Sequence, residues 1–226
     1  MSTINKTTVV LNDKPQNTQW SIRGHIAVAG ILAVWLGGAI WAAQVGVFDA
    51  PQGSPPTALL LAILIPVAIF VVATIAWPGL KQAAISIHPI LLNGVQTYRI
   101  IGSSFLIAMA FGELPAAFAW PAGLGDIAVG IGALFVLRRL TKNPQWIQSP
   151  RYLAFHLLGL ADFVLAVSAG TIVSIMALND EMARMNQAPL VLIPGFLVPL
   201  FAILHIIALM QRKARRQIAP HQGTES

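Results

Sequence analysis

Six long apolar stretches alternate with short polar connections along the chain. They cover residues 26–47, 57–77, 89–111, 115–137, 152–178 and 189–210. Each is close to the ~20 residues with which a helix crosses the hydrocarbon core of a bilayer. Because unpaired backbone amides are costly in lipid, we predict that every stretch is helical. The pattern therefore predicts an all-α fold, a polytopic transmembrane helical bundle of about six spans.

The polar ends of the chain predict how this bundle is oriented. Residues 1–25 form a polar N-terminal segment without the apolar core of a secretory signal, and residues 211–226 form a basic tail. With both termini cytoplasmic, twelve basic residues fall on the inner side and one, Arg184, on the outer side, as the positive-inside rule requires. The twelve are Lys6, Lys14, Arg23, Lys81, Arg138, Arg139, Lys142, Arg151, Arg212, Lys213, Arg215 and Arg216.

The composition excludes several classes of protein. The chain of 226 residues is 56% hydrophobic and 10% charged, whereas soluble domains are about 25% charged. It has no cysteine, which excludes disulfides, iron–sulfur clusters and cysteine nucleophiles. It also has no phosphate loop, nucleophile elbow or zinc-protease motif, so a non-enzymatic role is favoured. The net charge of +6 follows from topology, so we predict a lipid bilayer and no nucleic acid as partner, with a homo-oligomer left open.

Five ionisable residues lie within the predicted spans: Arg99, Asp126, His156, Asp162 and His205. Each costs about 2.5–3.5 kcal/mol on insertion scales, so such residues usually face the bundle interior and have partners. At about 1.5 Å per residue, Arg99 and Asp126 lie about 18 Å and 16 Å from the outer ends of their spans. The short connection between these spans makes them neighbours, which predicts an Arg99–Asp126 ion pair.

A second aspartate changes the charge balance. Asp162 lies about 15 Å from the inner end of the fifth span, and one arginine cannot neutralise two carboxylates. We therefore expect Asp162 to be left unpaired and to be the group that gains and loses a proton. The stretch 123–133 aligns without gaps on 159–169, with Asp126 on Asp162, through duplication or by chance. This pattern favours a small-solute or proton-coupled transporter or permease, and the alternative is an ion pair that only orients helices.

The region around Asp126 also predicts a break in the fourth helix. Pro121 inside a helix removes a hydrogen bond, and Gly123 and Gly125 follow it. Interrupted helices around a midplane charge are typical of transporter sites. If the helix instead began at Pro121, Asp126 would lie only about 8 Å deep and the ion pair would be lost. Tyr98, Gln96 and Asn93 are expected to line a hydrated path with Arg99. Glu113 is expected to lie at the outer mouth of this path or simply to mark the turn.

The histidines offer a different hypothesis. His156 and His205 lie about 6–8 Å from the inner ends of consecutive spans. Histidines on neighbouring helices can hold haem or a metal, which gives a membrane redox protein as the alternative, while the transporter hypothesis needs no cofactor. The simpler interpretation is that both histidines lie at the membrane interface, near the lipid headgroups. A third class is a non-catalytic assembly subunit.

The stretches "YRIIGSSFL" and "GELPAAFAWPAGLGDIAVG", between Tyr98 and Gly130, carry a family resemblance. They resemble a group of small bacterial polytopic integral membrane proteins that share L-P-x-x-F-A-x-P-A-G-x-G-D and have no assigned activity. The resemblance implies a multi-pass protein of the bacterial cytoplasmic (inner) membrane and implies no reaction. It draws attention to Arg99, Glu113, Pro121, Gly125 and Asp126.

Overall fold

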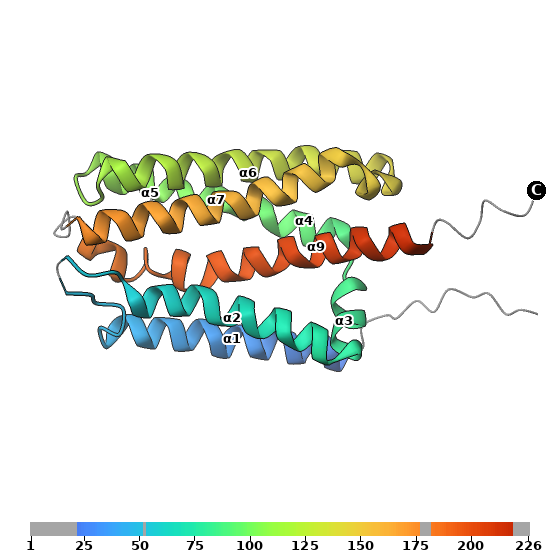
Figure 1. The fold of residues 1–226 in the computed structure, drawn as a ribbon, viewed down its shortest axis with the longest axis horizontal. Helices are drawn as coiled ribbons and strands as arrows, with labels where there is room; N and C mark the ends of the chain where they lie inside the picture. Colours follow the sequence, from blue (N-terminus) through green and yellow to red (C-terminus); the bar gives the residue numbers. More distant parts are fainter. Residues whose placement is uncertain (1–21, 52, 177–181, 219–226) are drawn as a thin grey trace, which may run out of the picture.

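The structure, a computed structural model, describes residues 22–51, 53–176 and 182–218, which form helices and the turns between them, with no strand among them. The α-helices are α1 (Ile22–Gln44), α2 (Thr57–Ala76), α3 (Pro78–Ile85), α4 (Pro89–Val95), α5 (Ser103–Ala110), α6 (Ala116–Lys142), α7 (Pro150–Ile175) and α9 (Val198–Ile218). Three short segments are 3-10 helices, η1 (Gln96–Gly102), η2 (Pro144–Gln148) and η3 (Ala183–Asn186), and one is a π-helix, η4 (Ile193–Leu197). The long helices run side by side along the molecule, and α3 lies across one end (Figure 1).

Five helices are long and apolar enough to cross a membrane, so the prediction of a membrane-type helical protein is confirmed at this level. They are 24–44, 57–76, 116–142, 150–175 and 193–217. Their outer faces carry exposed large apolar side chains, such as Val34, Ile69 and Val164, as lipid contact requires. The last helix continues to Ile218, so the first part of the predicted basic tail is helical.

The expected third span, 89–111, is divided into three pieces. An α-helix, α4, leads into the 3-10 segment η1, and α5 completes the stretch. At the rises of the two helix types, residues 89–110 extend about 36 Å, which exceeds the ~30 Å hydrocarbon core. All three pieces pack against α6. The stretch is therefore long enough to be a crossing, although it is not one regular helix.

The basic ends of the helices gather at one end of the bundle (Figure 1). There Gln211 of α9 donates to the carbonyls of Ile85 and Ile87 at 3.2 and 2.6 Å, and Arg212 donates to the carbonyl of Gln148 at 3.2 Å. These contacts join α9 to the α3–α4 and α6–α7 connections. Of the residues used for the orientation, Lys6 and Lys14 lie outside the described residues.

Candidate functional site

The segment η1 places Arg99 in the centre of the bundle. In a 3-10 helix, residues three apart lie in one line. Gln96, Arg99 and Gly102 have this spacing, and all three are buried. Tyr98 points the other way and is 72% exposed, so the prediction that it lines a path with Arg99 is wrong. The winding of this segment decides which of its polar residues faces inward.

Arg99 is completely buried and contacts three other helices. Its Nε donates to Asp126 Oδ1 of α6 at 2.7 Å, and its Nη2 donates to Asp162 Oδ2 of α7. Its Nη1 donates to the carbonyl of Gly159 at 3.1 Å and lies 3.3 Å from His205 Nε2 of α9. Four of the five guanidinium N–H groups thus have partners. The guanidinium carbon also lies 3.8 Å from the centre of a phenyl ring, that of Phe163.

The predicted Arg99–Asp126 pair is confirmed, and the expectation that Asp162 is left unpaired is wrong. Asp162 reaches the same guanidinium because a planar fork can bind two carboxylates on different edges. Its side chain is 13% exposed, against 9% for Asp126 and 0% for Arg99. With both carboxyls ionised, the cluster holds one positive and two negative charges. A single bound proton or cation would neutralise it.

Two glycines make room for the two aspartates. A Cβ atom on Gly102 of η1 would overlap the side chain of Asp126, and a Cβ atom on Gly125 of α6 would overlap the carboxylate of Asp162. Gly123 serves a related purpose, since its Cβ would lie 2.7 Å from the side chain of Leu106. Real Cβ contacts are not this short, so only glycine lets these elements approach so closely.

The predicted break of α6 is wrong. The helix is continuous from Ala116 to Lys142, although Pro121, its sixth residue, has no N–H to donate to the carbonyl of Ala117. The alternative start at Pro121 is also wrong, because the helix begins five residues earlier and Asp126 lies about 15 Å along it. The irregular element beside Asp126 is η1. Gly123 and Gly125 act through close packing.

Glu113 lies outside the charged cluster, in the turn between α5 and α6. Its carboxylate oxygen Oε1 is 3.8 Å from Nη2 of Arg184, and both side chains are exposed. This pair lies at the end of the bundle opposite the basic helix ends. This location fits both interpretations of Glu113, as a residue at the outer mouth of a path and as a residue that only marks the turn. An exposed ion pair of this length adds little stability.

The two histidines are brought together, as their positions on consecutive spans suggested. His156 Nδ1 lies 2.7 Å from His205 Nδ1, and both residues are fully buried. A guanidinium only donates, so His205 Nε2 accepts from Arg99 and its proton must lie on Nδ1. That proton is donated to His156 Nδ1, which places the proton of His156 on Nε2 when both rings are neutral. His156 Nε2 has no partner within the described part of the chain.

This arrangement bears on the haem or metal alternative. The lone pair of His205 faces Arg99, and the lone pair of His156 faces His205. Neither ring therefore has a free lone pair, and a metal would have to break one of these hydrogen bonds. Within residues 22–51, 53–176 and 182–218, no group of three or more His, Cys, Asp or Glu side chains is placed to hold a metal ion.

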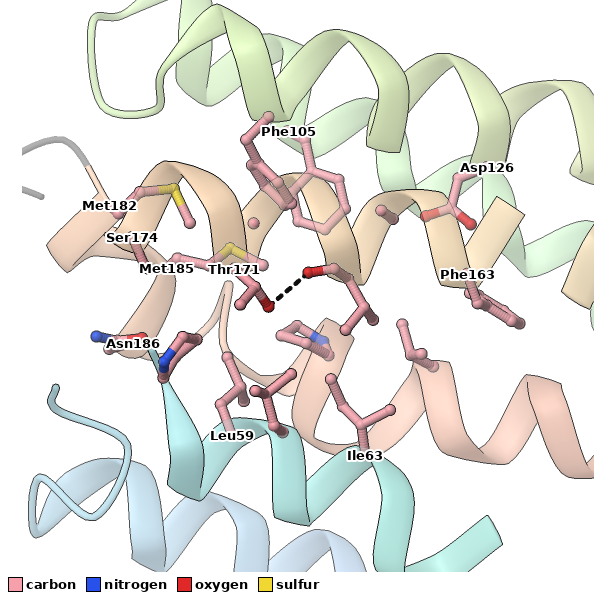
Figure 2. Close-up of a pocket in the computed structure, with 18 residues that line it drawn as sticks. Leu59, Ile63, Phe105, Asp126, Phe163, Thr171, Ser174, Met182, Met185 and Asn186 are labelled. Atoms are coloured by element: carbon pink, nitrogen blue, oxygen red, sulfur yellow. Dashed lines mark hydrogen bonds between the residues drawn. The ribbon is translucent and has the colours of Figure 1, made fainter. Parts of the chain in front are cut away.

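An apolar pocket leads to Asp126. The space between its walls is about 610 Å³ when the open space at its mouth is included. Figure 2 shows Asp126 at one end, beside Phe163, and Asn186 at the other end, near Met182 and Ser174. Of the described residues in its wall, Asp126 alone is charged, and Arg99 does not line the pocket. The pocket therefore reaches the cluster from the carboxylate side.

Asn93 and Gln96, which were expected beside Arg99, are buried, and the polar residue that sequence reasoning missed is Tyr152. Asn93 Nδ2 donates to the hydroxyl of Tyr152 at 3.2 Å, and Gln96 Nε2 donates to the carbonyl of Phe201 at 3.2 Å. The ring of Tyr152 packs 4.4 Å from that of His156, centre to centre. Asn93, Gln96 and Arg99 recur in the sequence at a spacing of three. An α-helix of 3.6 residues per turn would spread them over its surface, whereas tighter winding aligns them.

Comparison with known proteins gives one match. No curated protein and no solved structure matches this chain. A family model described as a domain of unknown function, DUF8737, matches residues 56–211. The matched region runs from the start of α2 into α9 and includes every residue of the Arg99 cluster and both histidines. The chain therefore belongs to the DUF8737 family, whose description assigns no activity.

Proposed function

We propose that this protein is a transporter that couples the movement of a small solute to that of a proton, through Arg99, Asp126 and Asp162. The observation that carries the proposal is the pocket that ends on Asp126, a member of a buried cluster with more negative than positive charge. Charged groups inside a membrane are costly and usually mark substrate, ion or proton pathways. An ion pair that only orients helices would need one carboxylate and no pocket.

The proposed topology has six crossings, with α4, η1 and α5 together forming the third. Both termini lie in the cytoplasm, in line with the basic residues at that end of the bundle, and the membrane is the bacterial inner membrane. The pocket then opens toward the outer side. The histidines lie on the cytoplasmic side of Arg99.

In the proposed mechanism, a proton or solute competes with Arg99 for a carboxylate. Protonation of Asp162, the more exposed of the two, would remove one acceptor from the guanidinium. A solute at Asp126 would weaken the second bond. Because η1 carries both Arg99 and Gly102, which contacts Asp126, η1 is the segment that would shift. Mid-span 3-10 segments often mark hinges.

Proton flux into liposomes tests this proposal. The purified protein is reconstituted around a pH-sensitive dye, and an inward proton gradient is imposed with and without candidate solutes. Asp162→Asn retains the shape of the side chain and removes its titration, so it should abolish the protein-dependent flux. The control Asp49→Asn changes an exposed aspartate outside the pocket and should leave the flux unchanged. Flux in Asp162→Asn equal to that of the wild-type protein would refute the role of Asp162.

The contact between His156 and His205 supports a second candidate, a membrane redox or metal protein. A purified sample with a Soret band, or with stoichiometric bound metal that is lost in His205→Ala, would favour it. Their absence would reject it. The third class, an assembly subunit, would be favoured by a stoichiometric partner that co-purifies with a chain that moves no protons.

A further inference from the structure

The wall of the pocket shows which charge its ligand carries. Arg99 has no exposed surface, and its donors are engaged by Asp126, Asp162, Gly159 and His205. It cannot reach an anion in the pocket without breaking those bonds. Asp126 does face the pocket, and only its Oδ1 is bonded to Arg99. The pocket thus presents a carboxylate and conceals the guanidinium.

The remaining walls suit a cation with an apolar body. They include the rings of Phe105 and Phe118 and the thioethers of Met182 and Met185. Aromatic faces attract cations, and methionine sulfur is soft and polarizable. The polar groups toward the Asn186 end are the neutral side chains of Thr171, Ser174 and Asn186 (Figure 2). Among the described residues that line this pocket none is basic, so no described side chain in its wall opposes a positive charge.

The size of the pocket limits the ligand. About 610 Å³, with the open space at the mouth included, is an upper limit on the volume that a ligand can fill. Strongly hydrated inorganic cations need several oxygen ligands, and this pocket is mostly apolar. An organic cation brings its own apolar surface and needs one counter-charge. Because the cluster has one excess negative charge, a monovalent cation neutralises it.

We infer that the pocket binds a small organic monovalent cation, an amine or quaternary ammonium with an aromatic or aliphatic body, with its charge at Asp126. This inference rests on the proposed function, since it names the class of solute for the same site. It also implies exchange with a proton, because either charge neutralises the cluster. A cation and a proton would then occupy the cluster alternately.

Equilibrium binding tests the inference without any transport. Labelled benzyltrimethylammonium is titrated onto the purified protein, with phenylacetate as a competitor of similar ring size and opposite charge. The cation should bind saturably, and phenylacetate should not displace it. Asp126→Asn should weaken binding at least tenfold. Equal competition by phenylacetate, or unchanged binding in Asp126→Asn, would overturn the inference.

A second variant keeps the test valid if Asp126→Asn fails to fold. Ala166→Phe fills the pocket from α7 and changes no charge, and it should abolish binding. Its control is Val164→Phe, two residues away, where the native residue is 65% exposed. This variant should bind the cation as the wild-type protein does. Binding that survives Ala166→Phe would place the cation elsewhere and refute the inference. Proton flux that depends on Asp162 in a protein that binds no cation would reject this inference alone. Cation binding without such flux would reject the transport proposal alone.

Discussion

Replacing Gly125 by alanine should separate Asp162 from Arg99 without changing any charge. The new Cβ would occupy the position of the Asp162 carboxylate, which must turn away from the guanidinium. Alanine improves the helix by about 0.5–1 kcal/mol. Loss of a hydrogen bond between charged groups costs about 1.5–3 kcal/mol. The net effect is a destabilisation of about 1–2 kcal/mol, which for a protein of this size lowers the melting temperature by about 2–8 °C.

Thermal unfolding of the purified variants in detergent measures this effect. The matched control is Gly132→Ala on the same helix, where the added Cβ would meet only a ring edge of Phe155 at 3.2 Å. It should leave the melting temperature unchanged or raise it. The decisive comparison is Gly125→Ala in an Asp162→Ala background, where the carboxylate is absent and the added methyl should cost nothing. An equal loss of stability in both backgrounds would show that Gly125 acts by helix spacing alone, contrary to this reasoning.

Three further predictions concern the same region. Arg99→Gln leaves two buried carboxylates without a cation and should destabilise the protein by about 3–5 kcal/mol. Adding Asp126→Asn should recover part of this loss in the same melting assay, and no recovery would contradict the charge argument. Gly159→Ala would place a methyl group against the ring of His205 and should cost about 1–3 kcal/mol. Tyr98→Phe should change stability by less than about 0.5 kcal/mol and leave proton flux intact, because the side chain is exposed. Loss of proton flux in this variant would show that Tyr98 does line the path.

The helical fold and the central ion pair could be predicted because both follow from features of short stretches of the sequence. Apolar length predicts membrane helices, and the short turn before Ala116 makes the Arg99 and Asp126 segments neighbours. The fate of Asp162 could not be predicted in this way. Its partner lies 63 residues away, and the contact depends on how α7 packs against α6 and on the space left by Gly125.

By itself, the sequence determined that the chain forms apolar helices, that basic residues gather at one end, and that arginine and aspartate share the interior. Hydrophobicity and the cost of buried charge impose these features on any packing of the helices. Only the tertiary structure decided that α6 is continuous, that η1 is the irregular element, and that Tyr98 faces outward. It also decided that one guanidinium serves both aspartates and a histidine, and that the pocket meets a carboxylate. These outcomes depend on the winding of a few residues and on contacts between helices distant in sequence, which local patterns do not encode.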